Sequence, residues 1–179
     1  MENGVQMLQY ASNHAKEREQ KYLTFKLADE EYGIEILKVK EIIGMMPITS
    51  VPRTPDFYKG VINLRGKVIP VVDLRLRFGM EEKEYSLQTC IVVVEVTEDG
   101  MTETTGIVVD AVSEVVNIKP EDTEEAPTFG DMVNTQFISA MAKTGGGVKI
   151  LLDIDRVLGT NQGNGSYSNS QTDNLGPVQ

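Results

Sequence analysis

The 179-residue sequence has few of the residue types from which catalytic and metal sites are usually built. It contains one histidine, one cysteine and no tryptophan. Because His14 stands in a polar N-terminal stretch, neither a histidine-centred triad nor a zinc site with histidine ligands is expected. No phosphate-binding G-x-x-x-x-G-K-[ST] pattern occurs, since Gly145-Gly146-Gly147 is not followed by Lys-Ser/Thr. We therefore expect no catalytic residues, no bound metal and no cofactor.

Long apolar runs and a second cysteine are also missing. Cys90 cannot form an internal disulfide, and its position in the apolar run CIVVVEV favours a buried thiol. No stretch approaches the roughly 18 apolar residues of a membrane-spanning helix. The N-terminus lacks the basic start and apolar segment of a secretory signal. These absences predict a cytoplasmic protein that does not insert into a membrane.

Positive charge is scarce, and the formal net charge is −10. Lysine and arginine never cluster beyond two residues, so nucleic-acid binding is not expected, because it depends on neutralising phosphates. The many acidic residues are typical of a solvated surface. They leave a carboxylate-based hydrolase open as an alternative, although no pattern indicates one.

What the sequence does contain is a series of short strand signals. Two alternating segments, 21–28 and 32–39, flank a polar turn at Asp29-Glu30-Glu31 and predict a hairpin. Two β-branched runs, 67–72 and 90–96, have strand length. Frequent glycine and proline favour small barrels over a βαβ sheet. Two short helices are expected after capping aspartates, at Asp73–Phe78 and Asp153–Leu158.

An internal repeat sharpens this prediction. The segment Tyr32–Ile43 aligns with Thr105–Val116, and Phe57–Gly79 aligns with Phe137–Gly159, without a gap inside either block. The identity is low, so chance similarity stays open as an alternative. Two copies of one unit predict two similar subdomains, each too small for a good core alone and therefore packed on a shared apolar layer.

The domain organisation follows from composition and from the repeat. Residues 1–19 are expected to form a flexible or partly helical leader. The polar stretch 160–179 is too poor in large apolar residues to order itself and is expected to be a disordered tail. The folded part, 20–159, is expected to divide into subdomains of about 20–85 and about 86–159, with a possible exchange of terminal strands.

One turn differs between the two copies. The first copy has Asn63-Leu64-Arg65-Gly66 before a strand, and the second has Lys143-Thr144-Gly145-Gly146. Asn and Gly suit a tight turn, and an arginine displayed on such a turn can bind a carboxylate through two hydrogen bonds. The loss of the arginine in the second copy favours a functional role for Arg65, although a structural role stays open.

A second pair of equivalent segments is Val39–Glu41 and Val112–Glu114. Their apolar residues are core in one interpretation. In the other, they flank a groove between the two copies, where an amphipathic partner helix could bind.

These motifs resemble the CheW family of chemotaxis coupling proteins. The matching segments are DEEYGIEILKVKEI from Asp29, PDFYKGVINLRG from Pro55, IPVVDLR from Ile69 and GIVVDAVSEV from Gly106. In order and spacing they cover roughly residues 20–158. The chain has no room for a kinase core or a receiver domain, so it resembles the stand-alone member of the family.

The resemblance implies an all-β fold of two five-stranded SH3-like barrels with short helices. It implies a non-catalytic adaptor that binds chemoreceptor tip helices and the regulatory domain of the histidine kinase CheA, recruited to receptor arrays at the inner face of the membrane. The implied receptor-binding residues are Val39, Glu41, Arg65, Cys90, Val112 and Val115. The implied kinase-binding residues are Met46, Ile48, Val51, Phe57, Tyr58, Lys59 and Gly60. A small hydrolase and a small-molecule binder are the alternatives from other classes.

Overall fold

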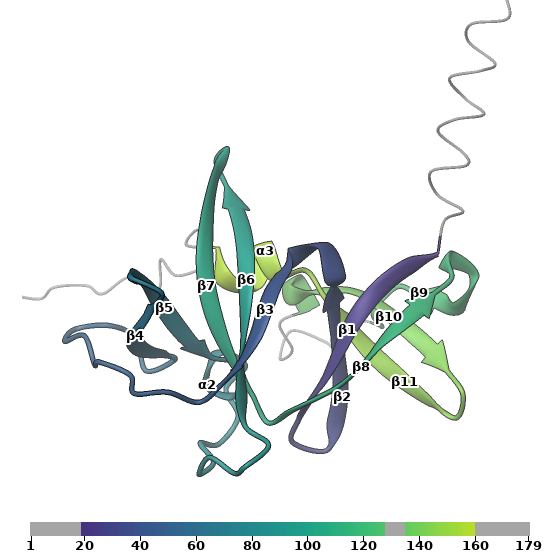
Figure 1. Ribbon diagram of the computed structural model, residues 1–179. Coiled ribbons are helices and arrows are strands. Elements are labelled where there is room, and N and C mark those ends of the chain that lie inside the picture. Colours follow the sequence, from purple (N-terminus) through teal and green to yellow (C-terminus); the bar gives the residue numbers. More distant parts are fainter. Residues whose placement is uncertain (1–18, 128–134, 160–179) are drawn as a thin grey trace, which may run out of the picture.

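The computed structural model describes residues 19–127 and 135–159 and consists mostly of β-strands (Figure 1). The expectations for His14, the leader up to residue 18 and the tail from residue 160 lie outside these residues. The strands are β1 (Gln20–Leu27), β2 (Glu30–Glu35), β3 (Val39–Gly44), β4 (Tyr58–Leu64), β5 (Lys67–Asp73), β6 (Cys90–Glu98), β7 (Met101–Val109), β8 (Ala111–Ile118), β9 (Thr123–Glu124), β10 (Ile138–Thr144) and β11 (Gly147–Leu152). The helical turns are η1 (Ile36–Lys38), α2 (Leu74–Arg77), η2 (Pro120–Asp122), η3 (Thr135–Phe137) and α3 (Ile154–Leu158).

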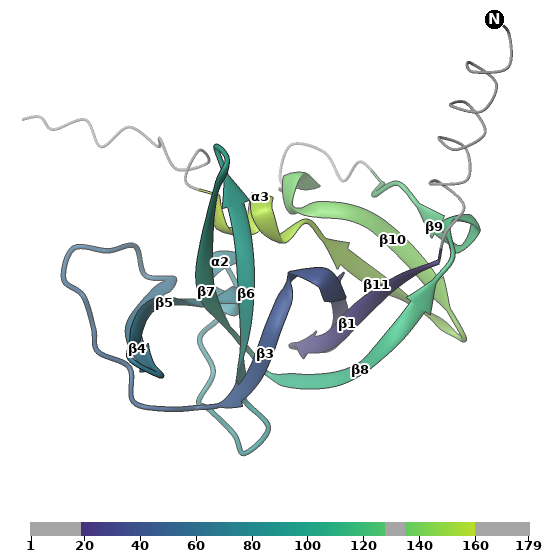
Figure 2. The ribbon, with the colours of Figure 1, turned by 45° about the horizontal axis from the view of Figure 1, so that its top comes forward.

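The strands form two sheets that lie side by side (Figures 1 and 2). The five-stranded sheet has the order β3-β6-β7-β5-β4, and the six-stranded sheet has the order β8-β1-β2-β11-β10-β9. The sixth strand, β9, has only two residues. The predicted all-β class with two packed units and short helices is confirmed.

The repeat predicted from the sequence is present in the strand pairing. Among the described residues, two strand pairings are parallel, β5 with β7 and β11 with β2. They align Val71 with Gly106 and Leu151 with Gly33, which are equivalent positions in the two copies. A Cβ atom on Gly106 would lie 2.8 Å from a methyl group of Ile91, and one on Gly33 would lie 2.9 Å from a methyl group of Leu151. The glycines match because both pairings leave no room for a side chain.

Both predicted helices also follow their capping residues. The Asp73 side chain accepts a hydrogen bond from the Leu76 backbone N–H at the start of α2, and Asp153 does the same for Arg156 at the start of α3. These caps satisfy backbone donors that the first helical turn leaves unpaired. The carbonyls of Phe57 and Phe137, again equivalent residues, each accept a hydrogen bond from the capping aspartate's backbone.

The two repeats do not correspond to the two sheets. The chain moves between sheets at Ile36–Lys38 and again at Asp110, so β1 and β2 join the strands after β7 in the six-stranded sheet. A division near residue 85 falls between β5 and β6, inside the five-stranded sheet. The strand expected over 32–39 ends at Glu35 for the same reason, because η1 redirects the chain toward the other sheet.

The main hydrophobic core lies between the sheets, and each sheet has a smaller cluster on its other face. The central cluster joins Leu23, Phe25 and Ile34 of the six-stranded sheet to Val92 and Ile107 of the five-stranded sheet, among others. Along β6, alternate residues face different clusters: Val92, Val94 and Val96 face the central one, and Ile91 and Val93 face the second. Burial on both faces explains why this strand is a continuous β-branched run.

The half-buried Arg77 joins residues of the two halves of the chain beside this core. Its guanidinium carbon lies 4.7 Å from the ring centre of Phe57 and 4.6 Å from that of the equivalent Phe137. The Arg77 Nε donates a hydrogen bond to the Val157 carbonyl at 2.9 Å. A planar cation between two aromatic faces is attracted to both rings. Burial lowers the pKa of Arg77 from its ordinary value.

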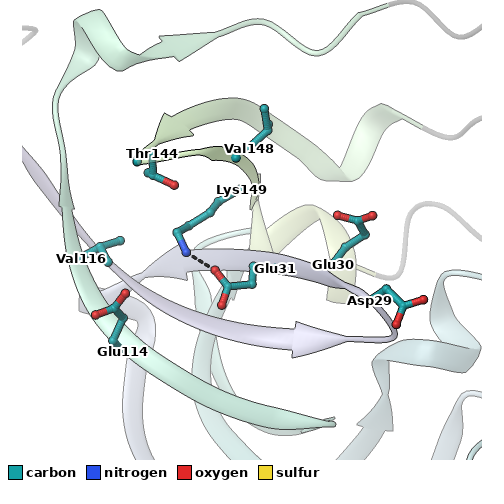
Figure 3. Close-up of a pocket in the computed structure, with 10 residues that line it drawn as sticks. Asp29, Glu30, Glu31, Glu114, Val116, Thr144, Val148 and Lys149 are labelled. Carbon is teal, nitrogen blue, oxygen red and sulfur yellow. Dashed lines mark hydrogen bonds and ion pairs between the residues drawn. The ribbon is translucent and has the colours of Figure 1, made fainter.

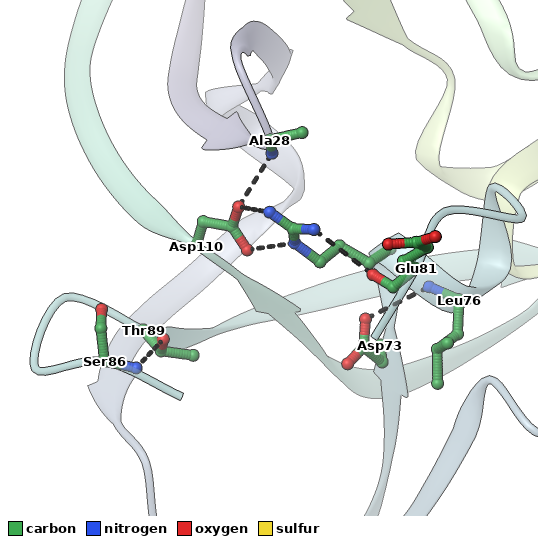
Figure 4. A network of polar contacts seen from close by, with 8 residues as sticks. Ala28, Asp73, Leu76, Glu81, Ser86, Thr89 and Asp110 are labelled. Atoms are coloured by element: carbon green, nitrogen blue, oxygen red, sulfur yellow. Dashed lines mark hydrogen bonds and ion pairs between the residues drawn. The ribbon is translucent and has the colours of Figure 1, made fainter. Parts of the chain in front are cut away.

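Each crossing between the sheets is held by an ion pair. Arg75 donates hydrogen bonds from Nε and Nη2 to the two carboxylate oxygens of Asp110, at 2.8 and 2.6 Å (Figure 4). Asp110 also accepts a hydrogen bond from the Ala28 backbone N–H in the β1–β2 turn. At the other crossing, Lys38 donates to Asp155 at 2.7 Å. Asp155 is equivalent to Arg75 in the repeat, so the sign of the charge is reversed between the copies.

Candidate functional site

Two edge strands, β3 and β8, border the seam where the sheets meet (Figure 2). In the ladder with β6, Val39 and Ile42 pair with Val94 and Val92, whose side chains face the central cluster. In the ladder with β1, Val112 and Val115 pair with Phe25 and Leu23, which face the same cluster. Residues that pair directly across an antiparallel ladder point to one face. The four residues therefore lie on the seam side of their sheets.

We call Val39, Ile42, Val112 and Val115 the seam face. Val39 and Val112 are half-buried, whereas Ile42 and Val115 are 46% and 51% exposed. In the repeat, Val39 is equivalent to Val112, and Ile42 to Val115. A bulge shifts the pairing in both strands. On β3 it lies between Val39 and Glu41. On β8 it lies between Val112 and Val115, opposite Leu23 and Phe25 of β1. The seam face is thus an approximately symmetric pair of apolar strips.

Cys90 lies where the two strips approach one another. It pairs with Gly44 at the end of β3, and the backbone of Val112 lies within hydrogen-bonding reach of its sulfur. Burial raises the pKa of the Cys90 thiol, with a smaller opposing contribution from the backbone of Val112. The thiol therefore stays protonated at neutral pH and contributes to the surface as a small apolar group.

Glu41 and Arg65 lie together, on the opposite side of β3 from the seam face. Glu41 pairs with Val93, whose side chain faces the second cluster. Arg65 donates from Nη1 and Nη2 to the two Glu41 carboxylate oxygens at 2.7 and 2.8 Å. The Arg65 side chain is 75% exposed. Because β3 and β4 are the two edges of their sheet, this pair connects one edge to the turn at the other.

The turn that carries Arg65 imposes an unusual backbone conformation. Arg65 has φ 51° and Gly66 has φ 84°, and the Asn63 side-chain oxygen accepts a hydrogen bond from the Gly66 N–H. Two consecutive positive φ angles match the two-residue hairpin turn that the strand twist favours. Most residues avoid this region, and the second copy has Gly145 in place of Arg65.

Most of the residues that the family resemblance implies for kinase binding make structural contacts within the fold. Met46 and Ile48 pack against the second cluster, and Phe57 contacts Arg77. Val51 is exposed, whereas Tyr58 is half-buried. These positions lie on and beside the long connection between β3 and β4.

Two further members of that group have defined structural roles. Lys59 forms an ion pair with Glu82, and hydrogen bonding to Glu82 raises the pKa of Lys59. Gly60 has φ 138°, and a Cβ atom there would lie 2.0 Å from the Thr49 carbonyl oxygen. Only glycine fits, because Thr49 bonds to the adjacent Val61 through both backbone hydrogen bonds.

An open depression in the six-stranded sheet lies between the β1–β2 turn, strand β8 and the β10–β11 turn (Figure 3). Its volume is ≈ 600 Å³, and four carboxylates line it, from Asp29, Glu30, Glu31 and Glu114. Lys149 forms an ion pair with Glu31, and this hydrogen bond lowers the pKa of Glu31. Across residues 19–127 and 135–159, no group of three or more His, Cys, Asp or Glu side chains is arranged to hold a metal ion.

The described helices are all short, and none is long and apolar enough to cross a membrane.

Comparison with known proteins identifies the family. The model of the CheW-like domain matches residues 21–162. The chain belongs to the CheW-like domain family. It is 38% identical to the chemotaxis protein CheW of Klebsiella aerogenes, over 80% of this chain and 84% of that protein. It is 31% identical to the chemotaxis protein CheW of Rhizobium meliloti, over 82% of this chain and 92% of that protein.

A solved structure agrees with the fold. The crystal structure of the scaffolding protein TtCheW from Thermoanaerobacter tengcongensis superimposes with a TM-score of 0.71 at 37% sequence identity. The match covers 80% of this chain and 95% of that chain. The CheW-like domain thus accounts for nearly all of the described residues.

Within this CheW-like domain, the structure brings together some of the sequence-predicted site residues and separates others. Val39, Cys90, Val112 and Val115 lie along the seam, whereas the Glu41–Arg65 pair faces away from it. Sequence reasoning missed Ile42, although the repeat offered a signal, because Ile42 is equivalent to Val115. Nothing in the sequence pattern indicated that Arg75 and Arg77 meet their distant partners.

Proposed function

We propose that this CheW-like domain is a non-catalytic adaptor that couples chemoreceptors to the histidine kinase CheA in chemotaxis signalling arrays. Membership of the family supports this, as do relatives named chemotaxis protein CheW and a structural neighbour named as a scaffolding protein. In this proposal the protein works in the cytoplasm, at arrays on the inner face of the membrane. It binds no nucleic acid and needs no cofactor.

The observation that carries the receptor side of the proposal is the seam face. Two strips of apolar side chains border one seam, and the exposed members, Ile42 and Val115, occupy equivalent positions. Exposed apolar groups arranged along a seam suit the apolar stripe of an amphipathic helix. A receptor-tip helix is the expected occupant. The interface is small, so we expect an affinity of about micromolar strength, with arrays stabilised by multivalency.

Arg65 stays a proposed receptor-binding residue, and the kinase side of the proposal rests on the neighbouring β3–β4 connection and the start of β4. Arg65 occupies a backbone conformation that favours glycine, and its equivalent in the other copy is Gly145. An arginine retained in a strained turn, with its side chain mostly exposed, points to a role outside folding. Met46–Val51 and Phe57–Gly60 adjoin this region, and Val51 among them is a large apolar residue that is exposed. We assign Met46, Ile48, Val51 and Phe57–Gly60 to CheA.

Reconstitution tests the coupling. CheA autophosphorylation is measured with a receptor cytoplasmic fragment, with and without this protein. We expect the protein to raise kinase activity several-fold only when the receptor fragment is present, because coupling requires both contacts. Arg65→Glu is expected to abolish most of this activation without unfolding the protein. Lys67→Glu is the matched control, since Lys67 is an exposed basic residue of the same hairpin.

The outcome separates function from folding. A thermal melt of Arg65→Glu should resemble that of the wild type, because the side chain is exposed. Activation by Arg65→Glu at the wild-type level would remove the assigned role of Arg65. Failure of the wild-type protein to activate CheA with any tested receptor fragment would contradict the adaptor function itself.

A further inference from the structure

An ion pair between a turn and an edge strand is present in one sheet, whereas the equivalent positions of the other sheet lack its cationic residue. In the five-stranded sheet, Arg65 on the β4–β5 turn reaches Glu41 on the edge strand β3 with two hydrogen bonds. In the six-stranded sheet, the residue equivalent to Glu41 is Glu114 on the edge strand β8. The residue equivalent to Arg65 is Gly145 on the β10–β11 turn. The second copy therefore keeps the carboxylate and lacks the cation.

The space that Arg65 crosses in one sheet is open in the other. The depression of ≈ 600 Å³ is lined by Glu114 and, from the β10–β11 turn, by Gly145 and Gly147. Figure 3 shows Glu114 across the depression from Thr144 and Val148. The strands of the two hairpins also differ at two equivalent positions. Where the five-stranded sheet has the buried Ile62 and Ile69, the six-stranded sheet has the equivalent Ala142 and Lys149.

The electrostatics of the depression favour a cation. Four carboxylates line it, and the single ammonium, that of Lys149, already pairs with Glu31. Within the part of the chain that the structure describes, the Glu114 carboxylate makes no hydrogen bond and no ion pair. The backbone of Glu114 is fixed on both sides by the Thr24 hydroxyl, so its side chain starts from a defined position.

The chemistry of the occupant follows from the internal copy. There the equivalent carboxylate takes a guanidinium with both oxygens, a geometry that arginine offers and lysine does not. The four carboxylates of the depression are spread around its rim and do not converge on one point (Figure 3). A divalent cation binds best where several oxygen atoms converge on it.

We propose that this depression receives an arginine side chain from a partner protein, and that Glu114 forms with it the bidentate ion pair that Glu41 forms internally with Arg65. The exposed Val148 at the rim contacts the apolar stem of the incoming side chain. A single exposed ion pair contributes little affinity, so its main effect is to set the orientation of a larger interface. The inference is independent of the partners proposed above.

The probe is a blocked pentapeptide, Gly-Gly-Arg-Gly-Gly, titrated into the full-length protein and followed by amide chemical shifts. We expect saturable shifts at about millimolar peptide, centred on Glu114, Gly145 and Lys149. The same peptide with citrulline, which is uncharged, should give none, and the lysine peptide should bind about fivefold more weakly. Glu114→Gln should weaken the arginine peptide by about fivefold.

An internal competitor completes the test. Gly145→Arg places an arginine where the five-stranded sheet has Arg65, and a side chain at this position meets no atom within 4 Å. We expect this variant to lose the peptide-induced shifts, whereas Gly145→Ala, which carries the same turn strain without the charge, retains them. The absence of saturable shifts, equal binding of the lysine and arginine peptides, or tighter binding of Ca²⁺ at the same residues would overturn the proposal.

Discussion

Arg77 gives the sharpest test of how the two halves are joined. Replacing it by methionine keeps an unbranched side chain but removes the charge and the hydrogen bond to Val157. Two contacts with the rings of Phe57 and Phe137 contribute about 0.5–1 kcal/mol each. The hydrogen bond from a charged donor contributes about 1.5–3 kcal/mol. Relief of the desolvated charge offsets part of this sum, so we expect Arg77→Met to lower the free energy of unfolding by about 2–4 kcal/mol.

The assay is urea unfolding followed by circular dichroism, with the slope of the transition compared between variants. Arg77→Lys should recover only part of the loss, because lysine keeps the charge without the planar fork. Arg156→Met is the control: its side chain is 61% exposed and forms an ion pair with the nearby Asp153. We expect the control to change stability by less than about 0.5 kcal/mol. A loss below about 1 kcal/mol for Arg77→Met, or an equal loss in the control, would refute the reasoning.

Two further predictions follow from the crossings between the sheets. Hydrogen bonds from Arg75 and from the Ala28 backbone N–H hold the pKa of Asp110 below its ordinary value, although burial alone would raise it. A depressed folded-state pKa stabilises the protein above the unfolded pKa of about 3.9, and this stability is lost as pH falls through the folded value. Asp110→Asn should therefore cost about 2 kcal/mol at pH 7 and progressively less below pH ~4, and a pH-independent difference in unfolding free energy would contradict this. Cutting the chain after Glu84, in an exposed loop, should give two halves that are unfolded alone and recover the native circular dichroism when mixed; cooperative unfolding of either half alone would show that the sheets do not depend on both.

Much of the fold could be predicted from local chemistry. Alternation and β-branched runs located the hairpin at β1 and β2 and the strands β5 and β6. The aspartates at 73 and 153 located both short helices, because capping is a local interaction. The internal repeat predicted two similar units, and the paired contacts at Gly33 and Gly106 confirm their equivalence.

A possible exchange of terminal strands was expected from the sequence, but local patterns could not say which strands interleave. Alternating apolar residues continue past Glu35 through Ile36, so the pattern alone extends the strand. What ends it is the position of the other sheet, which depends on pairings with residues far away in sequence. A division at 85 follows naturally from the repeat, whereas the strand order joins β1 and β2 to the C-terminal strands.

Contacts between residues far apart in the sequence also limited the prediction of the site. The chemistry of Arg65 suggested a bidentate pair with a carboxylate, but its partner Glu41 lies on the opposite edge strand and no spacing rule connects them. Val112 and Val115 were identified by family resemblance, and the assignment of the site residues stays a prediction. Ile42 required both the repeat and the bulge in β3, because a regular strand would place it on the other face from Val39.

The central claim is that the seam face binds a receptor helix. Its most direct test is a titration of a receptor cytoplasmic fragment against wild type, Val115→Asp and Met101→Asp. Val115 lies on the seam face at 51% exposure, whereas Met101 is 67% exposed at the far β6–β7 turn. Val115 is preferable to the half-buried Val112, whose replacement by aspartate would also disturb the core. We predict at least about tenfold weaker binding for Val115→Asp and unchanged binding for Met101→Asp, because a buried carboxylate is costly at an apolar interface. Wild-type affinity in Val115→Asp, with its fold intact, would contradict the account.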